Sequence, residues 1–323
     1  MESSAGRRIL LLLGPTAVGK TDVAMALFDR LGGSEGARLI SVDSTMVYRG
    51  MDIGSAKPSP AQLERYPHAL IDIRHPAETY TVADFVSDAD AQIRAAFAVG
   101  QLPILVGGTM LYAKRFVEGI AALPVADPVV RAELEAAYRH QGGLVLHNQL
   151  AAIDPAAAAN IHPNNSQRLI RALEVVRITG QALSDQWDEL NGPGAVTRLG
   201  ATVFGCAIVP ESRSVLHARI AQRFAAMLDA GFVAELEQLR ADYEAGARWP
   251  SLRAVGYRQG LSYLAGECDL QTFRDQATTA TRRLAKRQMT WLRSWPDLWQ
   301  LHSGAPIDLA DAILKRWPEL DAR

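Results

Sequence analysis

Apolar residues recur along the first third of the chain in short continuous runs, and stretches of helical spacing separate these runs. The clearest helix lies over residues 82–97, with Thr81 as its N-terminal cap and Asp84 three residues later. Continuous apolar strands that alternate with helices are typical of a parallel sheet covered on both faces, so we predict an α/β fold. The apolar runs occupy residues 9–13, 38–42, 69–73 and 103–106.

The first apolar run leads directly into a glycine-bearing loop that ends in Lys-Thr, which is the pattern of a P-loop. Glycines let backbone N–H groups approach phosphate oxygens, and the helix predicted over residues 20–31 adds the positive end of its dipole. Lys20 adds a mobile charge, and Thr21 adds a hydroxyl suited to Mg²⁺. We therefore expect the protein to bind a diphosphate or triphosphate. The loop consists of Gly14, Pro15, Thr16, Ala17, Val18, Gly19, Lys20 and Thr21.

Between residues 121 and 197 the alternation of strands and helices stops. This segment is rich in Ala, Leu, Gln and Asn, has helical periodicity, and is interrupted by Asp-Pro, His-Pro and Gly-Pro pairs. A strand is then expected at 201–209, and a short one at 298–302. We predict a core domain formed by residues 1–120 and 198–323, with an all-helical insertion domain over 121–197.

Composition limits the classes of protein to which the chain can belong, but it does not identify a binding partner. Hydrophobic residues make up 48% of the 323 residues, and the formal net charge of −1 gives no overall signal for nucleic acid or membrane binding. Cys206 and Cys268 lie far apart without metal-ligand spacing, which fits a reducing compartment. The N-terminal leucine run is too short for a secretory signal, and no apolar stretch approaches membrane-spanning length. We expect a soluble cytoplasmic protein.

An acidic residue follows the second apolar run, but none follows the fourth. Asp43 closes the second run, whereas the fourth leads into Gly107, Gly108 and Thr109. Ligands of parallel sheets bind beyond the carboxyl ends of the strands, so the P-loop, Asp43 and Thr109 are expected to share one site. Two roles fit Asp43 equally well from its spacing. It is either a functional carboxylate that holds Mg²⁺ or accepts a proton, or a cap on the turn that follows.

Basic residues cluster on two predicted helices. The segment 278–294 contains no acidic residue, and its basic side chains share one broad helix face with tryptophans close behind. Such a face suits a polyanion such as RNA, although a solvent-exposed face is the commoner role of a charge run. The residues of this face are Arg282, Arg283, Lys286 and Arg287, and a similar polar face is formed by Gln167, Arg168 and Arg171.

Several sequence motifs occur together in one order along the chain. They lie at residues 14–21, 43–58, 107–112, 165–174, 255–259 and 286–293. In this order the motifs make the chain resemble the bacterial tRNA dimethylallyltransferase (isopentenyltransferase) family over nearly its whole length. The segment Ser44, Thr45 and Met46 differs from the residues that are more common at these positions in the family. The sequence carries no C-terminal Cys/His finger, so the resemblance is to bacterial forms.

The resemblance implies a P-loop NTPase-like parallel sheet with a helical insertion, and a prenyl-transfer enzyme. Such an enzyme moves a dimethylallyl group from dimethylallyl diphosphate to N6 of the adenosine 3′ to the tRNA anticodon. The P-loop would hold the leaving diphosphate, with Mg²⁺ on Thr21. Asp43 would accept the proton of the amine, and Thr109 would orient the base. We add Arg219 and Arg223 as diphosphate-binding residues, whose alternative role is surface charge on an amphipathic helix.

The resemblance also assigns tRNA contacts, and we add the basic C-terminal helix as a source of phosphate contacts. No membrane partner is expected, and the chain is expected to be monomeric. The predicted tRNA-binding residues are Asp43, Ser44, Thr45, Met46, Thr109, Arg131, Gln167, Arg168, Leu169, Ile170, Arg171, Arg253, Gly256, Tyr257, Arg258, Gln259, Arg282, Arg283, Lys286 and Arg287.

Three other functions compete with this interpretation. A P-loop phosphotransferase for a small metabolite would consume ATP and would need neither the basic helices nor the insertion. An isopentenyltransferase that acts on free AMP would use the same chemistry without binding tRNA. A nucleotide-gated RNA-binding protein without enzymatic activity would tolerate the loss of Asp43. The lack of a second strand-end acid and the acid-free basic helix favour the tRNA prenyltransferase.

Overall fold

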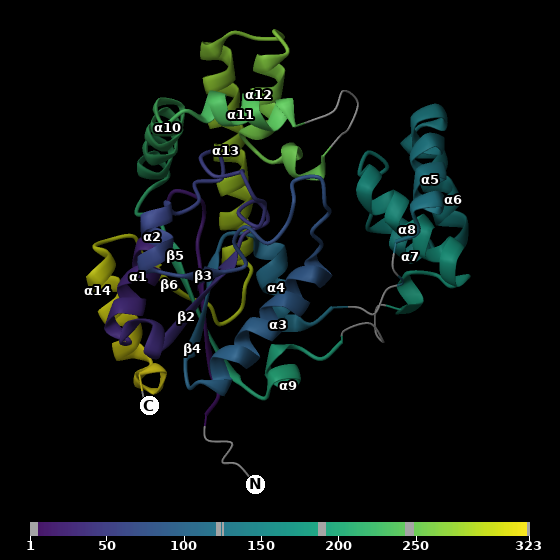
Figure 1. Ribbon diagram of the computed structural model, residues 1–323. Coiled ribbons are helices and arrows are strands. Elements are labelled where there is room, and N and C mark those ends of the chain that lie inside the picture. The colour runs from purple at the N-terminus through teal and green to yellow at the C-terminus, as the bar shows by residue number, and fades with distance from the viewer. Residues whose placement is uncertain (1–5, 121–123, 125, 187–191, 243–248, 322–323) are drawn as a thin grey trace. The chain divides into compact units, whose positions relative to one another are not determined.

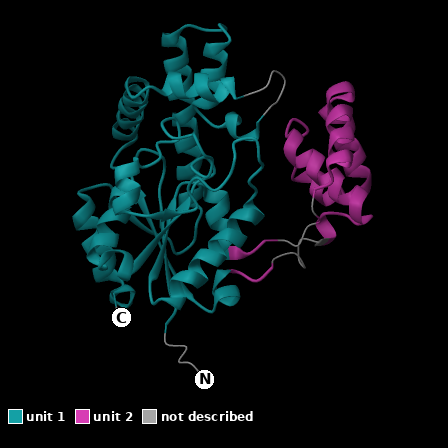
Figure 2. Cartoon of the chain, in the orientation of Figure 1, with its two compact units in different colours: residues 1–117, 195–323 teal, residues 118–194 magenta. Residues whose placement is uncertain are grey.

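The structure is a computed structural model of the chain, which divides into two compact units (Figure 2). Unit 1 comprises residues 1–117 and 195–323, and unit 2 comprises residues 118–194. The insertion expected over residues 121–197 thus corresponds to a unit that begins and ends three residues earlier. The structure describes residues 6–120, 124, 126–186, 192–242 and 249–321.

A six-stranded parallel sheet forms the centre of unit 1 (Figure 1), with the strand order β3-β2-β4-β1-β5-β6. β1 and β4 are buried at almost every position, as expected for strands covered on both faces. The predicted α/β fold is confirmed, as is the short strand expected near residue 300. The strands are β1 (Arg8–Leu13), β2 (Ala37–Val42), β3 (His68–Ala69), β4 (Leu102–Gly107), β5 (Thr202–Val209) and β6 (Trp299–His302).

The expectation that the apolar run at 69–73 forms a strand is wrong beyond its first residue. β3 ends at Ala69, because Leu70 and Asp72 adopt left-handed backbone conformations with φ of 65° and 56°. The chain therefore turns here. The N–H of Asp72 donates to the carbonyl oxygen of Met46 over 3.2 Å, so this turn supports the loop that follows β2.

Helices flank the sheet, and the predicted N-terminus of α3 is confirmed. The N–H of Asp84 donates to Oγ1 of Thr81 over 3.2 Å, and the N–H of Thr81 donates to the Asp84 carboxylate over 2.8 Å. The helices of unit 1 are α1 (Lys20–Arg30), α2 (Pro60–Arg65), α3 (Val82–Ala98), α4 (Met110–Glu118, which leads into unit 2), α9 (Ala195–Leu199), α10 (Arg213–Asp229), α11 (Phe232–Ala241), α12 (Tyr257–Leu264), α13 (Leu270–Arg293) and α14 (Pro306–Arg316), with 3₁₀ turns at η1 (Gly33–Glu35), η3 (Pro250–Arg253) and η4 (Pro318–Leu320).

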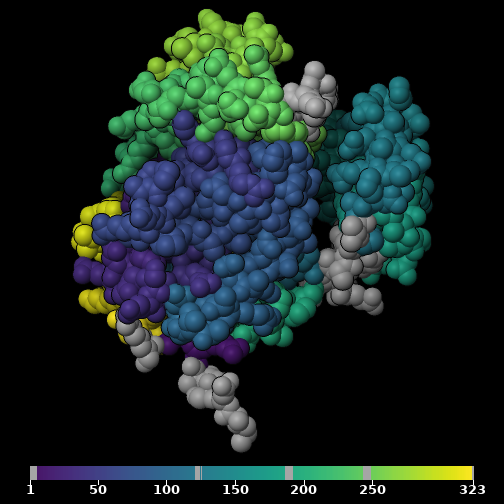
Figure 3. Space-filling view, viewed as in Figure 1, coloured from purple at the N-terminus to yellow at the C-terminus, as the bar shows by residue number. Residues whose placement is uncertain are grey.

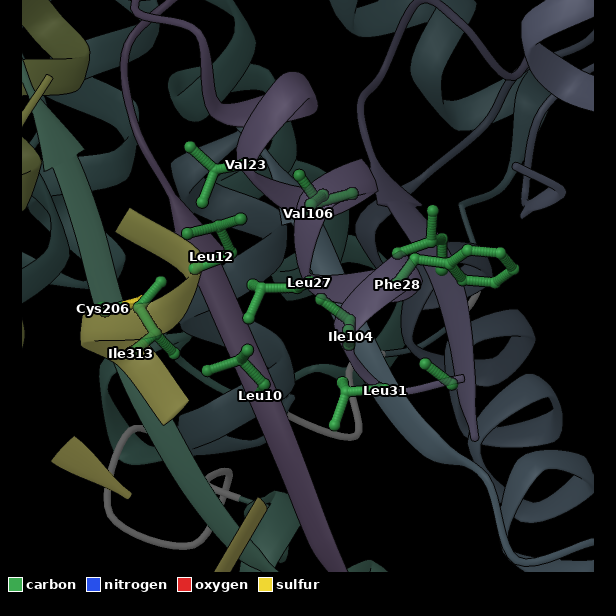
Figure 4. Packing of buried hydrophobic residues seen from close by; sticks show 14 of the residues in the cluster. Leu10, Leu12, Val23, Leu27, Phe28, Leu31, Ile104, Val106, Cys206 and Ile313 are labelled. Atoms are coloured by element: carbon green, nitrogen blue, oxygen red, sulfur yellow. The ribbon is translucent and has the colours of Figure 1, made fainter. Parts of the chain in front are cut away.

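One face of the sheet packs against α1 and α14. Leu10 and Leu12 of β1 and Ile104 of β4 belong to one buried cluster with Leu27 of α1 and Ile313 of α14 (Figure 4). Each of these five side chains is fully buried, which stabilises the fold by about 1.5–3 kcal/mol per side chain. This packing holds β1 and α1 together, and the P-loop that connects them has a rigid base as a result.

The carboxyl ends of three strands lie level with one another. Gly107 at the end of β4 is paired with Leu13 of β1 on one side and with Val42 of β2 on the other. A Cβ atom at Gly107 would lie 2.1 Å from the carbonyl oxygen of Val42, so only glycine allows this approach. The P-loop, Asp43 and Gly108 therefore leave the sheet side by side.

Unit 2 is helical in its described residues and has a core of its own. Leu134, Leu146 and Leu150 are almost fully buried there, in a cluster with Leu169 and Ile170. The helical character predicted for this segment is confirmed. Among the described residues of the whole chain, no helix is long and apolar enough to span a membrane. The elements of unit 2 are α5 (Pro128–Gln141), α6 (Gly143–Ile153), α7 (Pro155–Ala159), α8 (Ser166–Thr179) and the 3₁₀ turn η2 (Ser184–Gln186).

Candidate functional site

A cavity of about 370 Å³ lies in unit 1 at the carboxyl ends of β1, β2 and β4. Lys20 and Thr21 line it from the loop after β1, Asp43 from the loop after β2, and Thr109 from the loop after β4. Residues of α10 and α13, residues 54–56 and 58 of the segment after β2, and Val255 and Gly256 also line it. The groups that the sequence analysis expected to meet at one edge of the sheet do line one cavity.

The backbone of the P-loop is shaped to receive an anion. Ala17 and Gly19 have left-handed φ angles of 64° and 97°, and such a conformation at a non-glycine residue costs about 1–3 kcal/mol. Gly19 is the N-cap of α1, and no side chain in the described part of the chain caps that helix end. The first N–H groups of α1, from Lys20 onward, therefore lack helical partners and are available to an anion, which the helix dipole also favours.

Positive charge exceeds negative charge at the cavity. Of its described lining residues, Lys20, Arg223 and Arg287 are basic and Asp43 is acidic. Burial, and then the charge of Arg223, lowers the pKa of Lys20 to about 8, while Asp43 opposes this shift. Burial also lowers the pKa of Arg223, again with Asp43 in opposition. Two half-buried cations so close together favour a ligand with more than one negative charge.

Arg219 and Arg223, one turn apart on α10, differ in position. Arg223 lines the cavity, as expected for a diphosphate-binding residue. Arg219 is not among the lining residues in the described part of the chain, and its Nη1 donates to the carbonyl oxygen of Val18 over 3.3 Å. In this geometry Arg223 faces the space in front of the P-loop, whereas Arg219 supports the backbone of the P-loop.

The carboxylate of Asp43 caps a turn and also lines the cavity. Its Oδ1 accepts hydrogen bonds from the N–H groups of Thr45 over 2.8 Å and Met46 over 3.1 Å. The capping role considered from the sequence is therefore observed, and it involves Oδ1 and leaves Oδ2 outside these bonds. Ser44, Thr45 and Met46 line the cavity as well.

Thr109 stands opposite this turn. Its Oγ1 accepts a hydrogen bond from the N–H of Ser44 over 3.1 Å and lies 3.4 Å from the Ser44 hydroxyl. Its own N–H donates to the carbonyl oxygen of Val42 over 3.2 Å. The side chains of Asp43 and Thr109 are therefore held by the same short turn at neighbouring strand ends.

The basic residues of α13 do not form one uniform face. Arg283 and Lys286 are exposed, and Arg287 is exposed at the cavity. Arg282 is half-buried beside α10, where burial and then its charge lower the pKa of His217. The expectation of one broad basic face is therefore only partly met. Instead, a separate face of α13 lines the cavity, formed by Thr281, Leu284, Gln288 and Trp291.

The segment 253–259, from the end of η3 into α12, combines exposed and buried residues. Arg253 and Arg258 are exposed and can meet a large ligand. Tyr257 is fully buried, with its hydroxyl donating to Glu235 over 2.7 Å, and Gln259 is buried, with its side chain accepting from the N–H of Gly256 over 2.9 Å. Tyr257 and Gln259 therefore shape the backbone in this structure, which corrects the expectation that their side chains contact tRNA; Gly256 itself lines the cavity.

In unit 2, the predicted tRNA-binding residues divide in the same way. Gln167 and Arg168 are exposed at the start of α8, whereas Leu169 and Ile170 belong to the unit's core. Direct tRNA contact by Leu169 and Ile170 is thus incompatible with their packing. The remaining two, Arg131 and Arg171, lie 3.8 Å and 2.7 Å from the buried carboxylate of Glu174.

Two residues near the cavity were not predicted from the sequence. Glu235 of α11 accepts hydrogen bonds from the N–H groups of Asp52, Ile53 and Gly54 at 2.6–3.2 Å, which fixes the loop after β2. Figure 3 shows the surface of this loop region, in blue-purple, adjoining the green surface of α11 and α12. The second residue is Gln288, which is buried although it lies among the basic residues of α13. No local pattern identifies Glu235, whereas Gln288 keeps helical spacing with Leu284 and Trp291.

Comparison with known proteins gives one consistent family. A family model described as IPP transferase matches residues 46–295. The tRNA dimethylallyltransferase of Chromohalobacter salexigens is 51% identical over 306 residues, which cover 95% of each chain. The tRNA dimethylallyltransferase 2 of Hahella chejuensis is 51% identical over 302 residues, which cover 90% of this chain and 89% of that protein.

Solved structures with similar folds include enzymes of the same kind. A tRNA isopentenylpyrophosphate transferase from Bacillus halodurans is 35% identical, with a TM-score of 0.68 and coverage of 97% of this chain and 98% of that one. A eukaryotic dimethylallyltransferase acting on tRNA is 22% identical, with a TM-score of 0.77 and coverage of 92% and 74% respectively, and at this identity it shows likeness of fold.

Proposed function

Because the chain belongs to the IPP transferase family, we propose that it is a tRNA dimethylallyltransferase. It transfers a dimethylallyl group from dimethylallyl diphosphate to N6 of the adenosine 3′ to the anticodon. One observation carries this proposal: a P-loop, a carboxylate at Asp43 and a hydroxyl at Thr109 line the same cavity in a chain with close relatives of that name.

The P-loop binds the leaving diphosphate. Backbone N–H groups at the start of α1 and the charges of Lys20 and Arg223 face the space where negative charge builds up as the allylic C–O bond breaks. Charge stabilisation by such preorganised donors is the largest contribution in many enzymes. The arrangement favours departure of diphosphate over transfer of a terminal phosphoryl group, since no strand-end acid besides Asp43 lines the described cavity.

The oxygen atoms at this edge of the cavity suit Mg²⁺. Thr21 offers a hydroxyl beside Lys20, at the same cavity as the P-loop. Magnesium keeps several waters and takes few protein ligands besides substrate phosphates, so this sparse oxygen set fits it. Thr21 would hold the ion, which when bound supplies further charge neutralisation for the diphosphate.

Asp43 accepts the proton of the nucleophile. The exocyclic amine of adenine is a weak nucleophile because its lone pair is delocalised into the ring, and removal of a proton as the C–N bond forms offsets this. The Oδ2 atom of Asp43 is the acceptor, while Oδ1 keeps the carboxylate fixed on its turn. Thr109 orients the base from the neighbouring strand end. General-base catalysis of this kind contributes a factor of about 10²–10⁴.

The acceptor adenosine must leave its stack to reach this cavity, at a cost of a few kcal/mol. The exposed groups that we propose to bind the surrounding tRNA are Arg253 and Arg258, the exposed basic residues of α13, and Gln167 and Arg168 of unit 2. Arg131 and Arg171 are kept as weaker candidates, since both already have a carboxylate partner. We also propose that the protein is cytoplasmic and monomeric. Light scattering of the purified protein tests the monomeric state.

The test is incubation of the purified protein with unmodified tRNA, Mg²⁺ and labelled dimethylallyl diphosphate, followed by nucleoside mass spectrometry. A dimethylallyl mass gain on one adenosine supports the proposal. With the Asp43→Asn variant, we expect little of this modified adenosine to form. Label on free AMP but not on tRNA would move the same chemistry to an adenylate acceptor. No transfer to either would overturn the proposal and return attention to ATP-dependent phosphoryl transfer.

A further inference from the structure

Gln288 occupies an unusual position in the basic helix α13. Its neighbours Lys286 and Arg287 are exposed, but Gln288 is only 8% exposed and belongs to the helix face that lines the cavity. A buried carboxamide has a high desolvation cost unless both of its ends find hydrogen-bond partners. In this case both ends do.

The two ends of the Gln288 side chain bind two different parts of the site. Its Oε1 accepts a hydrogen bond from the N–H of Thr16 over 3.0 Å, and its Nε2 donates to the carbonyl oxygen of Gly108 over 2.8 Å. Thr16 belongs to the P-loop, and Gly108 immediately precedes Thr109. One side chain thus joins the loop that would hold the diphosphate to the strand end that would orient the base.

The chemistry of this bridge is specific to glutamine. The N–H of Thr16 requires an acceptor, and the carbonyl oxygen of Gly108 requires a donor. Glutamate supplies the acceptor but not the donor, and methionine has a similar length but supplies neither. The bridge also adds no charge beside Lys20 and Arg223, where a further carboxylate would oppose the binding of an anion.

The space around Gly108 shows how closely these parts approach one another. A Cβ atom at this glycine would lie 2.6 Å from Nε2 of Gln288, 3.1 Å from the carbonyl oxygen of Gly14 and 3.5 Å from Nζ of Lys20. The P-loop, its lysine and the carboxamide therefore converge on one residue. A displacement that moves the P-loop away from Gly108 would lengthen or break at least one of the two hydrogen bonds of Gln288.

We propose that Gln288 is a positioning residue of the transfer reaction, which fixes the separation between the diphosphate cradle and the base-orienting Thr109. The inference rests on the proposed function, because that function places the two substrates at the two ends of the bridge. Gln288 acts through Thr16 and Gly108 and does not need to touch the reacting atoms. A misplacement of about 1 Å between reacting groups can cost about 10²-fold in rate.

The experiment compares Gln288→Met and Gln288→Glu with Gln276→Met and Gln276→Glu, since Gln276 is an exposed glutamine of the same helix. Single-turnover transfer is measured at saturating tRNA and dimethylallyl diphosphate, together with the affinities for tRNA and for magnesium pyrophosphate. All assays run well below each variant's melting temperature. We expect a loss in rate of about 10- to 100-fold for Gln288→Met with unchanged tRNA affinity. Gln288→Glu should also bind pyrophosphate more weakly, and the Gln276 variants should match the wild type.

A purely structural role predicts a lower melting temperature with a wild-type rate for the folded protein, and that result in both Gln288 variants overturns the proposal. If Gln288→Met does not fold, the near-isosteric Gln288→Glu alone decides by the same rate comparison. Hydrogen exchange at the N–H of Thr16, which donates to Oε1 of Gln288, reports on the bridge without any assay of transfer. Faster exchange at Thr16 in Gln288→Met than in Gln288→Glu, with a wild-type protein that transfers no prenyl group, would place the failure in the proposed function and not in the bridge.

Discussion

The N–H of Ser44 donates a hydrogen bond to Oγ1 of Thr109 over 3.1 Å and so links the ends of β2 and β4. The two residues follow strands that are paired in register at Val42 and Gly107. As a donor, the hydroxyl of Thr109 makes only a long contact of 3.4 Å, to Oγ of Ser44, among the described residues. A substrate atom at normal hydrogen-bond distance would therefore compete well for this hydroxyl hydrogen.

Two replacements of Thr109 test how much its hydroxyl group contributes to the rate of transfer. Thr109→Val keeps the shape of the side chain but leaves the N–H of Ser44 without its acceptor, and it removes the donor to the base. We expect the rate of transfer to fall by about 10- to 100-fold, as a lost hydrogen bond of 1–3 kcal/mol implies. Thr109→Ser retains the hydroxyl and should stay close to the wild type in single-turnover assays. Equal rates for the two variants would remove the hydroxyl from the mechanism.

Asp43→Asn isolates the basicity of Asp43 from its capping role. The amide oxygen of asparagine can still accept the bonds from Thr45 and Met46, so the turn and the melting temperature should be preserved. Loss of the proton acceptor should lower turnover by at least about 10²-fold, with little change in tRNA affinity. Asp43→Ala removes the cap as well and should also be less stable. Full activity of Asp43→Asn would contradict the assignment of a general base.

The pKa of Lys20 predicts how the use of dimethylallyl diphosphate depends on pH. Burial and Arg223 lower this pKa to about 8, so the ammonium group is charged below that pH and loses its charge above it. We expect kcat/KM for dimethylallyl diphosphate to decline as pH rises through about 8, because this parameter follows the free enzyme. In Lys20→Arg the charge persists throughout this range, since arginine stays protonated. A wild-type profile that remains flat well above pH 8 would contradict the prediction.

The fold and the centre of the site were predictable from the sequence because both depend on local patterns. The apolar runs mark β1, β2 and β4, and the loops that follow parallel strands leave from the same edge of the sheet. Lys20, Asp43 and Thr109 could therefore be assigned to one site before their geometry was known. The exception is the run at 69–73, where the left-handed Leu70 ends the strand although the hydrophobic pattern continues.

The direction of individual side chains was less predictable. Leu169 and Ile170 lie within the same motif as the exposed Arg168 but face the core, and Tyr257 is buried against Glu235. A sequence motif marks a segment without distinguishing contact residues from supporting ones. Long-range partners are harder still: Gln288 bonds to Thr16, which lies 272 positions away in the sequence.

Arg168 and Arg171 should respond differently to substitution, although they lie one turn apart on α8. Arg168 is exposed, so Arg168→Gln should weaken tRNA binding severalfold at low salt and leave stability unchanged. Arg171 pairs over 2.7 Å with the fully buried carboxylate of Glu174, and Arg171→Gln would leave that charge poorly compensated. We expect a loss of about 3 kcal/mol in the free energy of unfolding. Urea denaturation and filter binding of tRNA distinguish the two effects, and a reversed pattern would contradict the assignment.

The two arginines of α10 provide a matched pair for the diphosphate site. Arg223 is half-buried and lines the cavity, so Arg223→Gln removes a charge that faces the diphosphate and should raise KM for dimethylallyl diphosphate by about 10-fold or more. Arg219 donates to the carbonyl oxygen of Val18 from outside the cavity, so Arg219→Gln should change KM only slightly. Affinity for magnesium pyrophosphate, measured by calorimetry, should follow the same order. Equal effects of the two substitutions would show that Arg219 also reaches the diphosphate, against the geometry of the site.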